Sequence, residues 1–336
     1  MMTTSGDGLS IGVVIPAYRS GSTIGETLDA VAAQTVSPES VIVVVDGPDP
    51  ETESVVRSHG SGVELFVLPA NTGGPAIPRN AGLVRLLENH AIDAVWFLDA
   101  DDLPDPRFLA GMSEAMARHP EADLVGARFT TWRIGEERPP GDPCAPSDAA
   151  LGSIDLDSYL GSTGSLLPSF TLVRIRALSS LRDSEEPFDP DLPNNQDYEM
   201  FVRMLARRPG VRIEWSGGGY RLHPAGISAA GARVWSCRMT ADKDLRDWFD
   251  RSGRPAMADR FDTASRSALR ATVRHLWKRN GIGDRAFAIR LLACDITEKR
   301  SLKSILLMVL MPLGLDRKTR GIPEAGDTRS SSLSRE

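Results

Sequence analysis

The stretch that decides the fold is Ala94-Val95-Trp96-Phe97-Leu98-Asp99-Ala100-Asp101-Asp102. Its first five residues form a short apolar run, as in a buried strand, and three carboxylates follow directly. Like charges so close repel one another unless a cation neutralises them. Because hard oxygen ligands suit Mg²⁺ or Mn²⁺, the cluster predicts a metal site at a strand end. The alternative is that these residues cap the helix predicted over Asp105–Arg118, since Asp favours first turns.

Before this stretch, short apolar runs alternate with segments of helical spacing. In the first such segment Ile24, Leu28 and Val31 fall on one side of a helix. Strands that alternate with helices in units of about 30 residues indicate a parallel sheet. Binding loops then gather at the carboxyl ends of its strands. The predicted strands are Ile11–Ile15, Val41–Val45, Val63–Leu68 and Ala94–Leu98, and the predicted helices are Thr23–Gln34, Glu51–Ser58 and Pro78–His90.

The later chain has a different pattern. An amphipathic helix is predicted over Gln196–Arg207, where Met200, Phe201, Met204 and Leu205 share one side. From about Val234 the pattern is helical throughout. Further expectations are a strand over Asp123–Phe129, an exposed and mobile loop over Arg133–Asp148, a late strand over Val211–Trp215, and basic helices over Ala264–Arg279 and Arg285–Leu302.

The bulk composition excludes several classes of protein. The 336 residues are 41% hydrophobic and 25% charged, as in an ordinary globular protein. A formal net charge of -6 argues against a general nucleic-acid binder. The cysteines Cys144, Cys237 and Cys294 are far apart in sequence, which argues against a disulfide framework and a zinc site. We therefore expect a cytoplasmic protein, and the polar residues 1–10 show no signal-peptide pattern.

Other motifs stand at the ends of the predicted strands. They are Val14-Ile15-Pro16-Ala17-Tyr18, Val44-Val45-Asp46-Gly47, and Asn71-Thr72-Gly73-Gly74-Pro75 followed by Pro78-Arg79-Asn80-Ala81-Gly82. With the acidic cluster, this ordered set resembles the family 2 glycosyltransferases of GT-A fold. Their usual run is Ile-Pro-x-Tyr, a strand ending in Asp-Asp-Gly, an Asn-x-Gly-x loop leading to Ala-Arg-Asn-x-Gly, and Phe-Leu-Asp-x-Asp-Asp. The resemblance covers roughly Ser10 to Ser228.

The resemblance implies a role for each matched residue on the donor side of the site. Pro16 and Tyr18 would line the base pocket of a nucleotide-sugar donor, and Asp46 would accept a hydrogen bond from a pyrimidine base, as in UDP or dTDP. This chain has one Asp before Gly47 where the family often has two, and we align Asp46 with the second. Arg79 would lie near the diphosphate. A turn-capping role for Asp46 and a surface position for Arg79 are the alternatives without the family context.

The metal is implied in the same way. Asp101 would ligate Mn²⁺ or Mg²⁺ directly, with Asp99 and Asp102 beside it. Tyr220-Arg221-Leu222-His223 resembles the family's Tyr-Arg-x-His loop, so that His223 would reach the metal or the diphosphate. A metal held there can stabilise a diphosphate as a leaving group. The alternative for His223 is a structural histidine.

The run Asn194-Asn195-Gln196-Asp197-Tyr198-Glu199 resembles the family's Glu-Asp pair before an aromatic-rich helix. That match makes Asp197 the general base, which would take the proton of a hydroxyl acceptor in an inverting displacement. Gln196 replaces the more common Glu. Glu199 is the second candidate for the base, and a helix cap is the alternative reading of Asp197.

The implied activity is therefore a metal-dependent, inverting glycosyltransferase. Its setting stays open between cell-envelope, polysaccharide and secondary-metabolite glycosylation, and the alternative is an inactive nucleotide-sugar binding protein. A dehydrogenase is disfavoured because the turn from Pro16 to Gly21 lacks Gly-x-Gly-x-x-Gly. The expected division is a disordered N-terminus over residues 1–9, a GT-A catalytic domain over 10–230, a helical region over 231–320 and a disordered tail over 321–336.

The helical region raises a separate question. Residues 266–320 carry 13 Lys and Arg against 4 Asp and Glu, and the apolar run Ile305–Leu315 is too short to span a bilayer, which takes ~20 residues. An apolar segment beside basic residues suits peripheral attachment to the inner face of the cell membrane. Packing on the catalytic domain and a homodimer contact are the alternatives.

Overall fold

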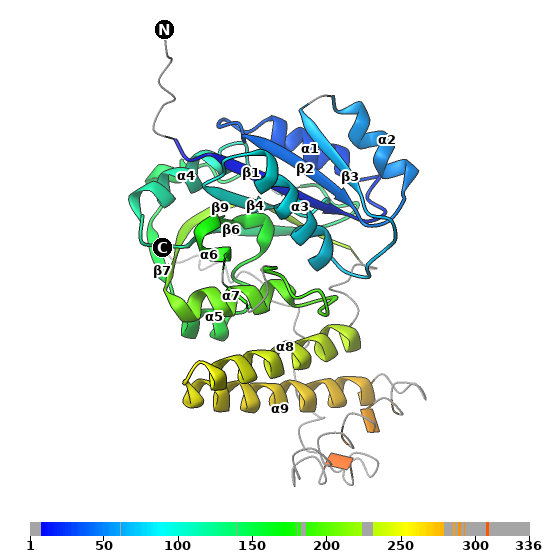
Figure 1. Ribbon diagram of the computed structural model, residues 1–336, viewed down its shortest axis with the longest axis vertical. Helices are drawn as coiled ribbons and strands as arrows, with labels where there is room; N and C mark the ends of the chain where they lie inside the picture. The colour runs from blue at the N-terminus through cyan, green and yellow to red at the C-terminus, as the bar shows by residue number, and fades with distance from the viewer. Residues whose placement is uncertain are drawn as a thin grey trace, which may run out of the picture.

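The computed structural model describes residues 8–278, apart from 61, 139, 180, 183–185 and 224–230, together with 285, 288, 289, 292, 307 and 308. Within these residues a single nine-stranded sheet forms the centre of the molecule, with strand order β3-β2-β1-β4-β8-β6-β9-β5 and with β7 paired to β9 (Figure 1). The strands are β1 Ile11–Ala17, β2 Ser40–Val45, β3 Val63–Val67, β4 Ala94–Phe97, β5 Leu103–Pro104, β6 Leu124–Arg133, β7 Leu151–Ile154, β8 Thr171–Arg174 and β9 Gly210–Leu222.

The sheet has a parallel half and a mixed half. Strands β1 to β4 are all parallel, so Ala17 lies opposite Val45 and Val14 lies opposite Phe97. The carboxyl ends of β1, β2 and β4 therefore meet at one edge, where the motifs that follow them can share a site. In the other half, β8 runs antiparallel to β4 and β6, and β9 runs parallel to β6 but antiparallel to β5 and β7.

Helices cover both faces of the sheet because successive strand residues point to opposite sides. On β1, Val14 packs in one core cluster with α3 and α7, whereas Val13 and Ile15 pack in the other with α1 and α4. All three side chains are fully buried. The helices are α1 Ile24–Ala32, α2 Pro50–Ser58, α3 Ala76–Asn89, α4 Phe108–Arg118, α5 Leu156–Gly161, α6 Ile175–Leu178, α7 Gln196–Arg207, α8 Gly231–Arg251 and α9 Pro255–Lys278.

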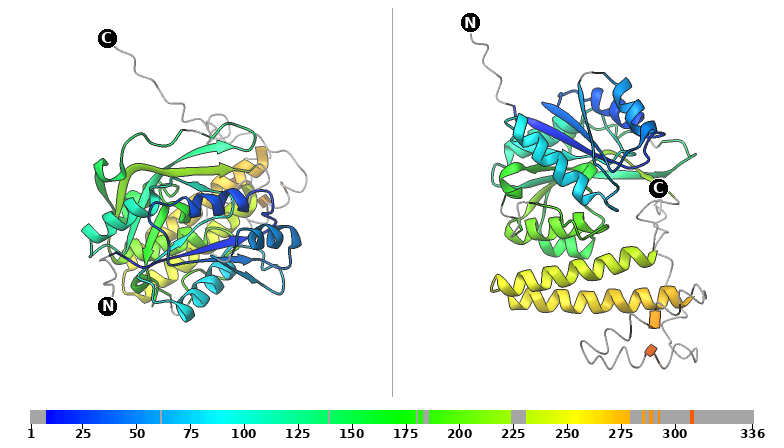
Figure 2. Two further views of the ribbon diagram at one scale, coloured as in Figure 1. Left: turned by 90° about the horizontal axis from the view of Figure 1, so that it is seen from above. Right: turned by 45° about the vertical axis from the view of Figure 1, so that its right-hand side comes forward.

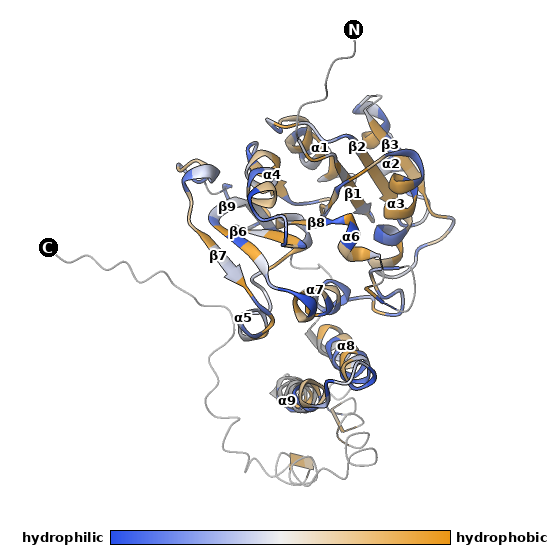
Figure 3. Cartoon of the chain, turned by 60° about the vertical axis from the view of Figure 1, so that its left-hand side comes forward, coloured by the Kyte–Doolittle hydropathy of each residue, from blue (hydrophilic) through white to orange (hydrophobic). Residues whose placement is uncertain are grey.

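The long helices α8 and α9 form an antiparallel hairpin beneath α7 and α5 (Figures 1 and 2). Figure 3 views α7, α8 and α9 nearly end-on, as successive layers below the sheet. Leu245 and Phe249 of α8 and Phe261 of α9 are buried in the same core cluster as α3 and α7. Of the three roles expected for the helical region, packing on the sheet domain is therefore observed for α8 and α9.

The predicted elements of the first half are confirmed, with ends that shift by a few residues. The helix predicted over Gln196–Arg207 has those bounds in the structure. The late strand is longer than Val211–Trp215, and β5, β7 and β8 were not predicted, so parallel pairing holds for only half of the pairs. These three strands have at most four residues each, too few to give a periodic pattern.

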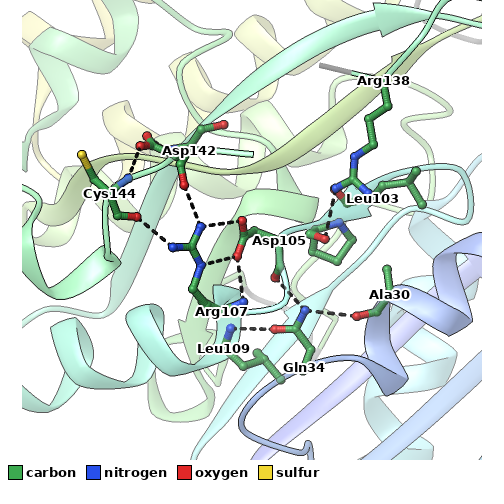
Figure 4. Close-up of polar contacts among 11 residues, drawn as sticks. Ala30, Gln34, Leu103, Asp105, Arg107, Leu109, Arg138, Asp142 and Cys144 are labelled. Carbon is green, nitrogen blue, oxygen red and sulfur yellow. Dashed lines mark hydrogen bonds and ion pairs between the residues drawn. The ribbon is translucent and has the colours of Figure 1, made fainter. Parts of the chain in front are cut away.

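The segment Arg133–Asp148 is mostly exposed, as expected, but its second half is fastened to the sheet domain. The guanidinium of Arg107 donates to both carboxylate oxygens of Asp105 and to the carbonyls of Asp142 and Cys144 (Figure 4). Gln34 ties the same corner to α1 and α4, since its amide donates to the Asp105 carbonyl and accepts from the Leu109 N–H.

Two expectations fall on other parts of the chain. The basic helix Arg285–Leu302 and the apolar run Ile305–Leu315 lie almost entirely outside the described residues. Among the described residues, no helix has the length and apolar character needed to cross a bilayer.

Candidate active site

The first part of the site is the loop after β2. Asp46 is 4% exposed, and its Oδ1 accepts a 2.8 Å hydrogen bond from the N–H of Thr72. Gly47 has φ +87°, and a Cβ there would lie 2.7 Å from the backbone nitrogen of Asn71, so this turn requires glycine. Asp46 thus holds the Asn71–Pro75 loop against the sheet edge, which is the turn-capping role that the sequence left open.

The end of β1 supplies an aromatic surface beside this loop. Pro16 is a buried strand residue, whereas Tyr18 is 49% exposed directly after the strand. The Arg19 guanidinium lies 5.2 Å from the centre of the Tyr18 ring, and the Tyr18 N–H donates to the hydroxyl of Ser20. An exposed flat ring at the edge of a binding loop is suited to stack on a planar ligand group.

Arg79 lies in the interior and not at the surface, which was the alternative to a place near the diphosphate. It is 2% exposed, its Nη2 donates to Oδ1 of Asp99 at 2.5 Å, and its guanidinium lies 5.3 Å from the ring centre of Phe188. Its Nε and Nη1 are buried and have no hydrogen-bond partner among the described residues. Arg79 is therefore not a surface charge: it lies beneath Asp99, with donors still to be satisfied.

Asp99 connects this arginine to the strand end. Its N–H donates to the hydroxyl of Ser169 at 3.1 Å, and the indole of Trp96 donates to the carbonyl of the same serine at 2.9 Å. Ser169 is fully buried and was not among the residues predicted from sequence. It stands in the turn before β8, a strand that pairs with β4 only in the folded sheet, so no local pattern could have identified it.

Asp101 and His223 are brought together across 122 residues of sequence, as the resemblance implied. His223 Nε2 lies 3.0 Å from Oδ2 of Asp101 but has no hydrogen-bond partner among the described residues. Burial and the neighbouring Asp99 carboxylate raise the pKa of Asp101 to about 7, and burial lowers the pKa of His223. Two lone-pair donors that converge without bonding each other, one of them a carboxylate destabilised by burial, suit a shared cation.

The described residues include no cluster of three or more His, Cys, Asp and Glu that could hold a metal ion. The Asp101–His223 pair could therefore bind Mg²⁺ or Mn²⁺ only with further ligands, such as diphosphate oxygens and water. Mg²⁺ is commonly bound in this way, by one or two protein ligands and substrate phosphates. The residues present fit a metal that binds together with a nucleotide.

Asp102 makes a structural contact of its own within the acidic cluster. It is completely buried, and its Oδ1 accepts a 3.0 Å hydrogen bond from the backbone N–H of Arg221. Burial and the carboxylates of Asp101 and Asp99 raise its pKa well above the usual value. Because Arg221 is two residues from His223, this bond fixes the end of β9 against the acidic cluster and so brings His223 to Asp101.

Asp197 stands in the first turn of α7. Burial raises its pKa, whereas the Arg79 charge and the N–H groups of its own turn lower it, and the Asp99 charge raises it further. Arg79 thus lies close enough to influence both Asp99 and Asp197. The base predicted from α7 and the acidic cluster from β4 are accordingly parts of one site.

Glu199, the second candidate for the base, is unsuited to that role. It is fully buried, and its Oε1 accepts from Arg182 at 2.7 Å and from Arg203 at 2.5 Å. Arg182 also donates to Asp189 at 2.8 Å. The carboxylate of Glu199 is thus the centre of an ion-pair network that holds the segment before α7 to the helix.

Two contacts close the site between α3 and α7. The side chain of Asn80 donates to the carbonyl of Phe188 and accepts from its N–H. A Cβ on Gly74 would lie 2.7 Å from Cα of Pro193, so the loop before α3 and the loop before α7 touch through their backbones. Two surface cavities, of about 550 and 420 Å³, lie elsewhere, at Arg208 and at the Glu26–Arg221 ion pair.

Comparison with known proteins agrees with this geometry. Residues 12–144 match the family described as Glycosyl transferase family 2. The chain is 29% identical over 133 residues to poly(ribitol-phosphate) beta-N-acetylglucosaminyltransferase TarP of Staphylococcus aureus, an alignment covering 38% of this chain and 39% of that relative. The chain thus spans about two-fifths of the length of this curated relative.

Solved structures share the fold over most of the chain. The crystal structure of Staphylococcus aureus TarS 1-349 in complex with UDP-GlcNAc matches with a TM-score of 0.62 at 17% identity, over 86% of this chain and 81% of that one. The mannosyltransferase PcManGT from Pyrobaculum calidifontis, in complex with GDP-Man and Mn²⁺, matches with a TM-score of 0.50 at 16% identity, over 94% and 83%. The fold is that of the GT-A nucleotide-sugar transferases. Within this class, residues 12–144 are similar to the family 2 glycosyltransferases.

Proposed function

We propose that this protein transfers a glycosyl group from a nucleoside-diphosphate sugar to a hydroxyl acceptor, with inversion at the anomeric carbon. The observation that carries the proposal is the position of Arg79, which is buried, bonded to Asp99 of the acidic cluster and near enough to Asp197 of α7 for its charge to lower the pKa of that carboxyl. Arg79 thus connects the acidic cluster, which would bind the diphosphate, with Asp197, which would accept the proton. Both lie near the edge where the parallel strands β1, β2 and β4 end. The resemblance of the ordered motifs and the family 2 match support the same activity.

In this reaction Asp197 accepts the proton of the attacking hydroxyl. Asp197 is half-buried, and its raised pKa makes it a stronger proton acceptor than an exposed carboxylate, while the Arg79 charge favours its ionised form. The two unpaired donors of Arg79 are available to the donor substrate, at its sugar or diphosphate oxygens. Asp101 and His223 would hold Mn²⁺ or Mg²⁺, which when bound neutralises the charge of the leaving diphosphate.

UDP is the first candidate nucleotide and N-acetylglucosamine the first candidate sugar. The fold neighbour TarS was crystallised with UDP-GlcNAc, and TarP is named as an N-acetylglucosaminyltransferase. Tyr18 supplies a stacking surface, and Asp46 can accept from a pyrimidine imide while its Oδ1 holds Thr72. dTDP is the second candidate nucleotide, because it presents the same imide.

The competing function is a nucleotide-sugar binding protein without catalysis. The presence of Asp101, Asp197 and His223 in one site favours the enzyme, since binding alone requires no buried carboxylate on the α7 side.

The test has two parts. A thermal-shift screen of UDP, dTDP, CDP and GDP with and without Mn²⁺ should give the largest rise in Tm for UDP with Mn²⁺, because ligands that bind the native state stabilise it. Release of UDP from UDP-GlcNAc, with and without hydroxyl acceptors, then separates enzyme from binding protein. Binding of UDP without any turnover, in hydrolysis or transfer, would favour the binding protein.

A further inference from the structure

The first turn of α7 is joined to the C-terminal hairpin by side chains of three residues. Tyr198, which follows Asp197, is 4% exposed, and its hydroxyl donates a 2.8 Å hydrogen bond to Oδ1 of Asp242 in α8. Arg238 holds both partners: its Nε donates to the same oxygen at 3.1 Å, and its guanidinium carbon lies 3.5 Å from the centre of the Tyr198 ring. We call Tyr198, Arg238 and Asp242 the α7–α8 tether.

A further contact holds the residue that precedes the helix. Asn195 has φ +63°, in the left-handed region that residues other than glycine rarely adopt. Its Nδ2 donates to the carbonyl of Val234 in α8 at 2.9 Å and to Oδ1 of Asn194 at 2.8 Å. The chain therefore enters α7 in a locally unfavourable conformation that a contact with α8 stabilises.

The tether restricts the orientation of the Tyr198 side chain, because its groups are buried and two of them are charged. Asp242 is 1% exposed, so its carboxylate depends on the Arg238 charge and the Tyr198 hydroxyl to offset the cost of leaving water. An ionised carboxylate can only accept, so the tyrosine must be the donor and its ring must stay in one orientation. The Tyr198 backbone, and with it the adjacent Asp197, is then held relative to α8.

We propose that Tyr198 and Asp242 are positioning residues for the reaction, which makes the C-terminal hairpin a working part of the active site. The inference rests on the proposed function. The pair fixes the rotation of the first α7 turn and thereby the place of the carboxylate of Asp197, which directly precedes Tyr198 in the chain. Neither residue needs to touch substrate. A base displaced by about 1 Å can slow a displacement by up to about 10²-fold, so the tether acts on the rate of transfer and not on donor binding.

The experiment uses the full chain and three variants. Tyr198→Phe removes only the hydroxyl, Asp242→Asn removes the charge at constant shape, and Asn195→Gly keeps the left-handed backbone while removing the side-chain contact. The control is Asp157→Asn, which breaks the ion pair between Asp157 of α5 and Arg260 of α9 and so weakens the hairpin contact to a different helix. Steady-state kinetics with UDP-GlcNAc and hydrogen–deuterium exchange of residues 194–200 are measured on each.

We expect kcat to fall about tenfold in each of the three variants while the donor KM stays within about twofold of the parent value. Exchange in residues 194–200 should be faster in these variants and unchanged in the control. Unchanged exchange, faster exchange with unchanged kcat, or an equal loss of kcat in the control would each overturn the inference. A parent chain inactive on every nucleotide sugar would contradict the proposed function instead, and the exchange comparison would still decide whether the tether orders the first turn of α7.

Discussion

The two sides of the candidate site hold their carboxylates in different ways. At the sheet edge, burial and the Asp99 charge raise the pKa of Asp101 to about 7. Nε2 of His223 lies 3.0 Å from Oδ2 of Asp101 and has no hydrogen-bond partner among the described residues. On the α7 side, the Arg79 charge and the N–H groups of the first turn offset the burial of Asp197. Under the proposed function a bound metal would offset the charge of Asp101, whereas the protein itself partly offsets the burial of Asp197.

The largest effect on activity is expected from substitution of Asp101. Asp101→Ala should lower transfer about 10³-fold, because a bound metal contributes several kcal/mol of charge stabilisation to the transition state. Chelation of the parent with EDTA should have the same effect, and added Mn²⁺ should restore the parent but not the variant. Release of UDP measures this, with Asp259→Ala on the exposed surface of α9 as control. Full activity after rigorous chelation would refute metal dependence.

Substitution of Asp197 should affect the rate of transfer and leave metal-enhanced binding of the nucleotide unchanged. Asp197→Asn should lower kcat by about 10²-fold, the usual contribution of positioned proton transfer. Mn²⁺-enhanced binding of UDP should persist, since the donor side is unchanged. Calorimetric titration with UDP and single-turnover kinetics separate the two effects. A variant that neither folds nor binds UDP would show that Asp197 is a structural cap.

Substitution of Glu199 tests whether a buried carboxylate on α7 serves as the general base or only stabilises the fold. Glu199→Gln should lower the free energy of unfolding by about 3 kcal/mol, because it leaves the buried charge of Arg203 without its partner and Arg182 with Asp189 alone. The kcat of the folded protein should be close to that of the parent. Urea unfolding measures the loss. Glu53→Gln, which breaks a partly exposed pair with Arg57, should cost only about 0.5 kcal/mol. A stable but inactive Glu199 variant would make Glu199 the base.

The smallest effect is expected where the two sides touch. Gly74→Ala places a methyl group 2.7 Å from the backbone of Pro193, and the backbone shift this forces should cost about 1–2 kcal/mol of stability and raise the donor KM. Gly161→Ala, where nothing lies within 4 Å of the new methyl group, is the matched control. Equal Tm and KM in both variants would show that the loops before α3 and α7 move independently.

Much of this site could be predicted from sequence because its motifs are local. A strand that ends in Asp46 or in the acidic cluster puts those residues at the carboxyl edge whatever the later topology, and Asp197 stands in the first turn of a helix whose period is evident. The ordered motifs thus predicted the GT-A fold, which is confirmed, while the roles that they imply for Pro16, Tyr18, Asp99, Asp101 and His223 stay predictions. The division at residues 230 and 231 stays a prediction.

Only the tertiary structure determines which partner each carboxylate has and how deeply it is buried. Asp101 and Asp102 are neighbours in the same motif. Asp101 lies against His223, whereas Asp102 is buried against the backbone of Arg221. Glu199 and Asp197 share a helical turn, yet one is paired with two arginines and the other lies in the site. The physical reason is that burial and pairing depend on which elements pack together across long sequence distances. Position in a strand or helix depends on only a few neighbouring residues.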